Sequence, residues 1–569
     1  MLFRLVHALL RVLVLPLNLL RRARAFPRGS LVAIEIDGAV ADLVPQPRFW
    51  EVWRAKSHTT SLHELSRVID EVVKDPRARG LLVTLKSFRG GMAAATSLRA
   101  LLLRARQASK DVIVHMPLGG DTKEVYLGSV ATKLYVGPQA LLSPVGFASA
   151  TRYVRRALDR AGIEPEVFAR GKYKSAGEQL VRDTMSEGQR EQTGALLDVF
   201  YDEVVEAIAS GRGLPPERVR TLVDGAPYRA PEAVQAGLCD GAAYEDALGG
   251  LLAVGGKKPR VVPAARYRRL VAETKGVRVR RAPVIGVIQV HGAIASDAPA
   301  FTRSMAIDDR VIAAVREARQ NPRVRGVVLH VDSPGGGALA SDRMHHELVQ
   351  LAAEKPLVCC MANVAASGGY YVAAAAHSIV AQPTTITGSI GVVAARVVIE
   401  PLLSRLGIHT EVQKRGSRSD MLQPTRHFDE GEREAFQREL DGMYRAFVGI
   451  VAEGRKRPYG EIEALAQGRV WSGKDALAQG LVDRLGGFDV ALASVRALVG
   501  GPSPSRLEPV ILTGTKKAPP PLDPPEKAAA QLLLAIDAVA KELGAGGLSL
   551  AFSREPFLAW SALASRFDV

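Results

Sequence analysis

The stretch NPRVRGVVLHVDSPGGGAL (321–339) decides how this chain is organised, because the chain carries a second, divergent copy of it. DPRARGLLVTLKSFRGGMA (75–93) matches this stretch at an offset of about 245 residues. A chain of 569 residues is long for one hydrophobic core, so more than one domain is expected. Two further pairs of segments match at similar offsets: LVAIEIDGAV (31–40) with VIGVIQVHGAI (284–294), and AVQAGLCDGA (233–242) with ALAQGLVDRL (476–485). The sequence therefore predicts two structurally equivalent repeats.

Within each repeat, apolar segments alternate with helical ones. GVVLHVDS (326–333) and PLVCCMANV (356–364) are typical of buried strands, whereas 310–320 and 339–355 have the pattern of amphipathic helices. Strands that alternate with helices of this length indicate an α/β fold with mainly parallel sheets and flanking helices. The three cysteines, Cys239, Cys359 and Cys360, have no disulfide or metal-ligand spacing, and the adjacent pair is interpreted as part of a strand core. We expect neither a metal nor a cofactor.

These patterns divide the chain into five predicted segments. They are a hydrophobic and basic N-terminal segment (1–28), an N-terminal repeat (29–250), a basic linker (251–283), a C-terminal repeat (284–500) and a tail (501–569). The tail contains a proline-rich linker and one amphipathic helix at 528–547.

The formal charge of +16 is concentrated in two of these segments. Six arginines and no acidic residue lie in the first 30 residues, and ten basic residues with one acid lie in 257–281. Aromatic residues are not interleaved with the basic ones, which argues against nucleic-acid binding. A basic patch beside a hydrophobic N-terminus instead favours contact with anionic lipid. Because Arg11 and Pro16 interrupt the apolar run, we expect an in-plane anchor or a short span, with a helix packed on the protein itself as the alternative.

The two repeats differ at the positions where catalytic residues would be expected. DSPGGG (332–337) follows a strand in the second repeat, whereas the first has KSFRGG (86–91). Clustered glycines let backbone N–H groups approach a ligand and stabilise an oxyanion, although an ordinary tight turn has the same sequence. ASGGYY (366–371) places Ser367 before two glycines at a helix start, opposite Thr122 in the first repeat. An N-cap serine is the structural alternative.

GKYKSA (171–176) in the first repeat contains Lys174, which aligns with Ser419 in the second. Each repeat thus lacks what the other keeps, and one active site completed by both would explain the pattern. A lysine can deprotonate a serine when burial lowers its pKa, and glycine N–H donors would complete an acyl-transfer site. His330, His345, His346 and His377 supply the competing Ser–His interpretation, but no orienting acid accompanies them.

Together, DSPGGG, AASGGYYVA, TGSIGV and GKYKSA resemble the long, double-domain form of signal peptide peptidase A, a serine protease family with the Clp-protease/crotonase-like fold. The resemblance covers about residues 30–500. It implies that Ser367 is the nucleophile, that Lys174 is the general base, and that Gly335 or Gly336 provides the oxyanion hole.

The resemblance also implies a bacterial inner-membrane endopeptidase that degrades cleaved signal peptides and other hydrophobic peptides, assembled as a bowl-shaped homotetramer. The broken N-terminal apolar run leaves the side of the membrane open, and the tail 501–569 has no clear counterpart in the family. A crotonase-type acyl-CoA enzyme and a non-catalytic membrane scaffold are the alternatives. The acyl-CoA enzyme would have no need of Lys174, and the scaffold would leave the Ser/Lys asymmetry unexplained.

Overall fold

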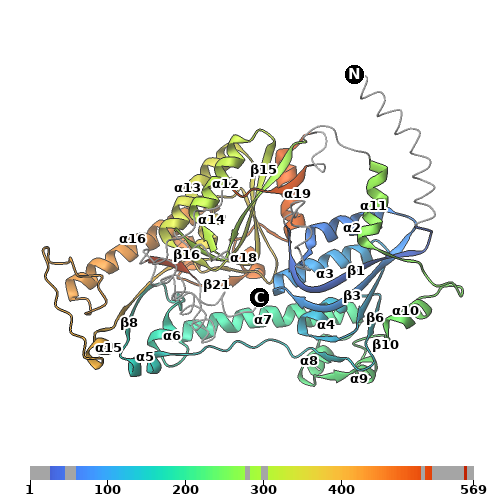
Figure 1. Cartoon of the computed structure of the whole chain (residues 1–569), viewed down its shortest axis with the longest axis horizontal. Coiled ribbons are helices and arrows are strands. Elements are labelled where there is room, and N and C mark those ends of the chain that lie inside the picture. Colours follow the sequence, from blue (N-terminus) through green and yellow to red (C-terminus); the bar gives the residue numbers. More distant parts are fainter. Residues whose placement is uncertain are drawn as a thin grey trace. The chain divides into compact units, whose positions relative to one another are not determined.

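The computed structural model describes residues 26–44, 59–275, 282–296, 305–501, 507–514 and 557–560. The chain forms two compact units (Figure 1): one contains Met1–Phe147 and Phe200–Ala282, the other Ala148–Val199 and Pro283–Val569. The units do not coincide with the sequence repeats, because 148–199 belongs to the first repeat by sequence but packs in the second unit. Lys174 lies in this segment, so a single unit contains both Lys174 and Ser367.

The first unit is built on a seven-stranded sheet in which every pairing is parallel. Its main path runs β10-β6-β4-β3-β1-β11, and β2 pairs with β1. The strands are β1 (Ser30–Ala41), β2 (Thr60–Ser61), β3 (Ala78–Arg89), β4 (Asp111–Met116), β6 (Lys133–Val136), β10 (Gly241–Ala242) and β11 (Val261–Pro263). A small separate sheet contains β5 (Gly119–Asp121), β7 (Leu141–Ser143) and β9 (Tyr228–Arg229).

The second unit repeats this order of strands. Its eight-stranded sheet includes the parallel series β22-β18-β17-β15-β12-β23, which corresponds strand for strand to β10-β6-β4-β3-β1-β11. The internal repeat and the α/β fold with mainly parallel sheets are therefore confirmed. The strands are β12 (Val284–His291), β15 (Val324–Ser333), β17 (Leu357–Ala366), β18 (Ser378–Ala381), β19 (Ile386–Gly388), β21 (Val470–Ser472), β22 (Arg484–Leu485) and β23 (Glu508–Ile511).

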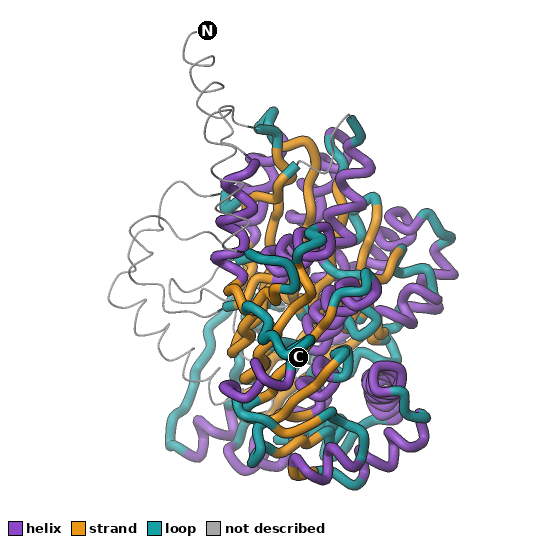
Figure 2. The backbone as a smooth tube through the Cα atoms, turned by 90° about the vertical axis from the view of Figure 1, so that its right-hand side faces the viewer, coloured by secondary structure: helices purple, strands orange, loops and turns teal. Residues whose placement is uncertain are grey.

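Helices cover both faces of this sheet. In Figure 1, α12 and α13 lie on one side of β15 and α19 on the other, and Figure 2 shows the alternation of strands and helices. Strands covered on both faces are apolar throughout, which explains why β15 and β17 have no alternating pattern. The helices of this unit are α5 (Arg155–Ala161), α6 (Glu178–Val181), α12 (Asp308–Gln320), α13 (Ala338–Glu354), α14 (Gly368–Ala373), α15 (Glu400–Arg405), α16 (Glu430–Arg455), α17 (Tyr459–Leu465), α18 (Gly473–Ala478) and α19 (Phe488–Val499).

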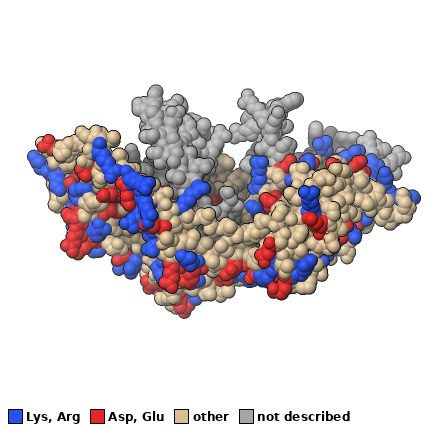
Figure 3. Space-filling view, turned by 90° about the horizontal axis from the view of Figure 1, so that it is seen from below, with Lys and Arg blue, Asp and Glu red and all other residues tan. Residues whose placement is uncertain are grey.

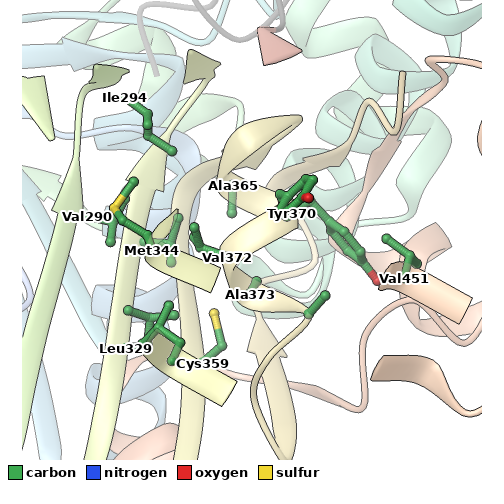
Figure 4. Packing of buried hydrophobic residues seen from close by; sticks show 14 of the residues in the cluster. Val290, Ile294, Leu329, Met344, Cys359, Ala365, Tyr370, Val372, Ala373 and Val451 are labelled. Carbon is green, nitrogen blue, oxygen red and sulfur yellow. The ribbon is translucent and has the colours of Figure 1, made fainter. Parts of the chain in front are cut away.

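The core of the second unit surrounds α14. All six residues of this helix are buried, and Figure 4 shows Tyr370, Val372 and Ala373 packed among Met344, Cys359 and Val451. All three cysteines are free and buried, and Cys359 and Cys360 lie in β17, as predicted for a strand core. The two glycines that begin α14 let the start of the helix approach the sheet closely, and Ser367, between β17 and α14, is buried inside the protein.

A second sheet of this unit carries the glycine-rich stretch. Its order is β14-β13-β16-β24-β20-β8, and its strands come from distant parts of the chain. They are β8 (Glu164–Arg170), β13 (Ala293–Ala295), β14 (Met305–Ile307), β16 (Gly335–Gly337), β20 (Val392–Val398) and β24 (Phe557–Trp560). The antiparallel pairing of β8 with β20 is what binds the segment 148–199 into this unit.

The first unit has helices α2 (Leu62–Lys74), α3 (Met92–Gln107), α4 (Thr122–Gly128), α8 (Pro216–Asp224), α9 (Ala230–Gln235), α10 (Glu245–Leu251) and α11 (Ala264–Lys275). Helix α7 (Glu187–Arg212) runs from the second unit into the first. Much of the predicted basic linker 251–283 is regular structure, since it contains β11, which extends the sheet, and α11.

Among the described residues, no helix is both long enough and apolar enough to cross a membrane. The N-terminal segment 1–28 lies almost entirely outside the described residues, as does the helix predicted at 528–547. On the face shown in Figure 3, Lys and Arg are interspersed with Asp and Glu, which agrees with a nearly neutral chain outside the two basic segments.

Candidate active site

Ser367 stands between β17 and α14, where a buried strand turns into a short buried helix. Its side chain is fully inaccessible, and its backbone has φ 55° and ψ −117°. A non-glycine residue in such a conformation costs about 1–3 kcal/mol and persists only where its surroundings hold it. The Ser367 N–H donates to the carbonyl of Gly388, and the Ser367 carbonyl accepts from the N–H of Tyr371. The turn is thus fixed from both sides.

The second glycine after Ser367 is required by close packing. A Cβ atom on Gly369 would lie 2.8 Å from the carbonyl oxygen of Ser333, at the end of β15. The start of α14 therefore packs directly against Ser333, two residues before the glycine strand β16. Ser367 occupies the N-cap position of α14, but its hydroxyl makes no capping hydrogen bond. The N-cap interpretation of the sequence consequently does not explain this hydroxyl.

Lys174 lies in the loop that follows β8, and its amine is directed at Ser367. Nζ is 2.8 Å from Ser367 Oγ, 2.9 Å from the carbonyl oxygen of Ser389 and 3.1 Å from Ser389 Oγ. Only 3% of Lys174 is exposed. Within the part of the chain that the structure describes, no carboxylate pairs with this amine. Burial therefore acts without compensation and lowers the pKa of Lys174 well below its usual value of 10.5.

The three contacts match the bonding capacity of a neutral amine. A neutral amine has two N–H donors and one lone pair. The carbonyl of Ser389 must accept, and Ser389 Oγ can accept the second N–H, so the lone pair is left for the Ser367 hydroxyl. Ser389 itself has a positive φ of 53°, and its N–H donates to the carbonyl of Arg469. Sequence reasoning did not single out Ser389, although it stands in the TGSIGV motif.

The loop that carries Lys174 is held by residues 467–470 of the second repeat. The N–H of Tyr173 donates to the carbonyl of Gln467, and a Cβ atom on Gly171 would lie 2.3 Å from the carbonyl carbon of Gln467. Gly468 faces Lys174 in the same way, with its own Cβ position 2.6 Å from Cβ of Lys174. Glycine at positions 171 and 468 thus permits the backbone of the Lys174 loop and that of residues 467–470 to pack closely beside Lys174.

Gln192, on α7, links the same two segments. Its Nε2 donates to the carbonyl of Tyr173, and the N–H of Val470 donates to its Oε1. Gln192 is buried, so both halves of its amide are used inside the protein. Neither Gln192 nor Gly468 could be predicted from the sequence, because no motif contains them and the contacts of Gln192 with Val470 and of Gly468 with Lys174 join residues about 280 and 290 positions apart.

Gly335 and Gly336 form the first part of β16, and Pro334 separates them from Ser333. Both have positive φ, 102° and 157°, and a Cβ atom on Gly336 would collide with the carbonyl oxygen of Ile294. The N–H of Gly335 donates to Ser333 Oγ. Asp332, which begins the DSPGGG motif, accepts from the N–H of Val364 and so fixes the strand that leads to Ser367. The glycines of the motif form a strand inside a sheet rather than an ordinary tight turn.

The histidines have other partners. Nε2 of His291 lies 2.7 Å from Nδ1 of His330, and His377 contacts the backbone of Leu357. His345 packs against the ring of Tyr371, and its burial lowers its pKa to about 4. Ser367 Oγ is instead hydrogen-bonded to Lys174, so the geometry favours Ser–Lys over Ser–His.

The first unit lacks this arrangement at the equivalent positions. The helix starts make Asp121 the counterpart of Ser367, one residue before the Thr122 expected from the sequence, because an offset of 246 rather than 245 aligns the N-caps. The N–H of Asp121 donates to Glu124, which is ordinary helix capping. Ser419, which aligns with Lys174, is exposed and bonds to the carbonyl of Gly416. One such site is therefore found in the described residues.

Comparison with known proteins agrees with the two repeats. Residues 104–253 and 349–500 match peptidase family S49, one region in each repeat. This chain belongs to peptidase family S49. The S49 chain is 31% identical over 474 residues to the chloroplastic serine protease SPPA of Arabidopsis thaliana, covering 82% of this chain and 68% of that protein. It is 30% identical to Protease 4 of Salmonella typhi over 77% of this chain and 72% of that protein.

A third relative, Protease 4 of Haemophilus influenzae, is 27% identical over 84% of this chain and 80% of its own length. The predicted family resemblance is confirmed, and this S49 protein is a serine-type peptidase. The acyl-CoA enzyme and the non-catalytic scaffold considered from the sequence are thereby set aside.

Proposed function

We propose that this S49 peptidase is a membrane-associated endopeptidase that hydrolyses hydrophobic peptides, including cleaved signal peptides, with Ser367 as nucleophile and Lys174 as general base. The observation that carries the proposal is the 2.8 Å contact between Nζ of Lys174 and Oγ of Ser367, in a site where no described carboxylate pairs with the amine. A buried lysine of lowered pKa can accept a proton near neutral pH, which an ordinary exposed lysine cannot do.

The acylation step follows from the three contacts of Lys174. The lone pair of Nζ takes the hydroxyl proton of Ser367 while Oγ attacks the carbonyl carbon of the scissile peptide bond. The two N–H groups of the amine stay on the carbonyl and the hydroxyl of Ser389, which hold the lone pair toward Ser367. The resulting ammonium then donates its proton to the nitrogen of the leaving amine, and an ester remains on Ser367. Water hydrolyses the ester by the same proton transfers in reverse.

The negative charge on the tetrahedral intermediate requires N–H donors beside Ser367. We assign this role to the glycine strand, with Gly335 or Gly336 as donor, because β16 starts two residues after Ser333, against which α14 packs. The N–H of Gly335 already donates to Ser333 Oγ. It would have to turn from that hydroxyl before it could donate to the intermediate.

The preference for hydrophobic peptides rests on the apolar surroundings of the site and on the family resemblance. Membrane association rests on the apolar and basic composition of residues 1–28. Assembly into a tetramer remains a prediction from the resemblance.

The test is a peptidase assay that compares an apolar signal-peptide core with a polar peptide of equal length. We expect hydrolysis of the apolar peptide at a much higher kcat/KM, with no hydrolysis by Ser367→Ala. Equal rates on the two peptides would reject the substrate class, and an active Ser367→Ala variant would reject the nucleophile.

A further inference from the structure

Arg469 lies between the segment that holds Ser389 and the loop that carries Lys174. Its carbonyl accepts a hydrogen bond of 2.6 Å from the N–H of Ser389. Its guanidinium lies over two aromatic rings, 4.9 Å from the ring centre of Tyr173 and 4.5 Å from that of Trp471. Tyr173 immediately precedes Lys174, and Ser389 contacts the amine of Lys174. Arg469 therefore contacts both the neighbour of the lysine and a residue that binds its amine.

Trp471 links the arginine to the backbone beside Ser367. A Cβ atom on Gly388 would lie 2.7 Å from Cδ1 of Trp471, so the indole packs directly on this part of the backbone. The carbonyl of Gly388 accepts from the N–H of Ser367. One ring on the guanidinium thus adjoins the lysine, and the other packs on the backbone that holds the proposed nucleophile.

An ion pair completes the contacts of the guanidinium. Nη1 of Arg469 lies 3.0 Å from Oε1 of Glu191, and the hydroxyl of Tyr173 donates to the same carboxylate. The side chains of Arg469 and Glu191 are 25% and 41% exposed, and exposed ion pairs contribute little free energy. A planar guanidinium also stacks on aromatic rings, which an ammonium group cannot do in the same way. The position of the lysine loop is therefore expected to depend on the stacking more than on the ion pair.

The first repeat keeps the aromatic residue of this arrangement but not the arginine. In each unit a short strand, β9 or β21, runs antiparallel to β7 or β19 and leads directly into a helix, α9 or α18. Aligned at the first residues of these helices, Tyr228 corresponds to Trp471 and Ala226 to Arg469. The fold of the first repeat thus forms with alanine at this position, and the arginine is present in the repeat that contains Ser367.

We propose that Arg469 is a positioning residue, which sets the distance between Nζ of Lys174 and Oγ of Ser367. Its guanidinium holds Tyr173, and with it the lysine loop, by stacking, while its carbonyl fixes Ser389. This inference rests on the proposed function. Without the guanidinium, the loop loses its stacked partner and the lone pair of Nζ points less often at the hydroxyl. Proton transfer then slows, whereas binding of the peptide is unaffected.

Steady-state kinetics of the full-length protein on an apolar peptide test this proposal. Arg469→Met keeps the aliphatic stem and the backbone carbonyl but removes the guanidinium. We expect kcat to fall by about tenfold or more with unchanged KM, because a misplacement of about 1 Å can cost about 100-fold in rate. Arg316→Met, at an arginine of the same unit that pairs with Glu347, is the control and should keep wild-type kcat.

Two further variants separate the stacking from the charge. Glu191→Gln removes the ion pair and leaves the guanidinium between its rings, so kcat should stay within about twofold of wild type. Arg469→Lys keeps the positive charge but lacks the planar group, so it should lower kcat with unchanged KM, as Arg469→Met does. Circular dichroism shows whether each variant is folded.

A double-mutant cycle tests whether Arg469 acts through Tyr173. The double variant Arg469→Met/Tyr173→Leu should lose no more kcat than the more severe of its two single variants, because both changes release the same loop. Losses that multiply would overturn the inference. Wild-type kcat in folded Arg469→Met or Arg469→Lys, or a loss carried by KM alone, would also overturn it and leave the proposed function standing. Wild type without activity on the apolar peptide would instead reject the proposed function.

Discussion

Gly468 and Lys174 meet backbone to backbone, and a Cβ atom on Gly468 would lie 2.6 Å from both the backbone nitrogen and Cβ of Lys174. Gly468 also has a φ of 74°, which disfavours any side chain. Gly468→Ala should therefore push Lys174 away from Ser367, and a displacement of about 1 Å can cost about 100-fold in rate. The measurement is kcat for an apolar peptide.

Gly460→Ala is the matched control, because a Cβ atom on Gly460 would meet nothing within 4 Å. It should keep wild-type kcat. Wild-type activity in Gly468→Ala would mean that the position of Lys174 does not depend on this contact.

The pH dependence of catalysis should follow the titration of Lys174. The amine acts as a base only when neutral, so kcat/KM should rise with pH and level off once Lys174 has lost its proton. Because burial lowers the pKa of Lys174 well below 10.5, the plateau should be reached well before pH 10.5. A profile between pH 5 and 11 checks this. A rate that still climbs at pH 10.5 would contradict the proposed role.

The stability of the protein should also depend on the titration of Lys174. In the unfolded chain Lys174 keeps its proton up to about pH 10.5, whereas in the folded chain it loses that proton at a lower pH. Between these two pKa values the unfolded state binds more protons, so the free energy of unfolding rises with pH. Lys174→Met removes this titration. The stability advantage of Lys174→Met over wild type should therefore shrink as pH rises, by up to about 1.4 kcal/mol per pH unit. Urea unfolding at several pH values measures it, and a constant difference would refute it.

Ser389 should contribute to kcat without affecting substrate binding. Ser389→Ala removes the hydroxyl that contacts Nζ but keeps the carbonyl contact. The loss of one hydrogen bond of about 1–1.5 kcal/mol corresponds to a kcat that is lower by about 5- to 13-fold, with unchanged KM. Ser419→Ala, at an exposed position, is the control. A changed KM with normal kcat would place Ser389 in substrate binding instead.

The repeat, the strand pattern and the pair Ser367 and Lys174 could be predicted from sequence because each depends on local signals. Buried parallel strands are apolar throughout, glycines mark close backbone approaches, and the loss of a motif in one copy points to a task kept by the other. The predicted strand and helix at 326–333 and 339–355 correspond to β15 and α13.

Long-range contacts account for what the sequence did not predict. The segment 148–199 joins the second unit because β8 pairs with β20, and no property of β8 alone specifies a partner more than 200 residues away. Ser389 acts partly through its carbonyl, which every residue possesses. The sequence patterns place the tail 501–569 outside both repeats, yet β23 extends the main sheet and β24 enters the second one.

The most direct test of the central claim compares two lysines that stand two residues apart. Lys174 is buried against Ser367, whereas the side chain of Lys172 is 58% exposed and lies near Glu191. We predict that Lys174→Ala lowers kcat for an apolar peptide by about 10²–10⁴-fold, the contribution of a positioned general base, while Lys172→Ala stays near wild type. Both variants should give the circular dichroism spectrum of the folded protein. Near-wild-type kcat in folded Lys174→Ala would contradict the account.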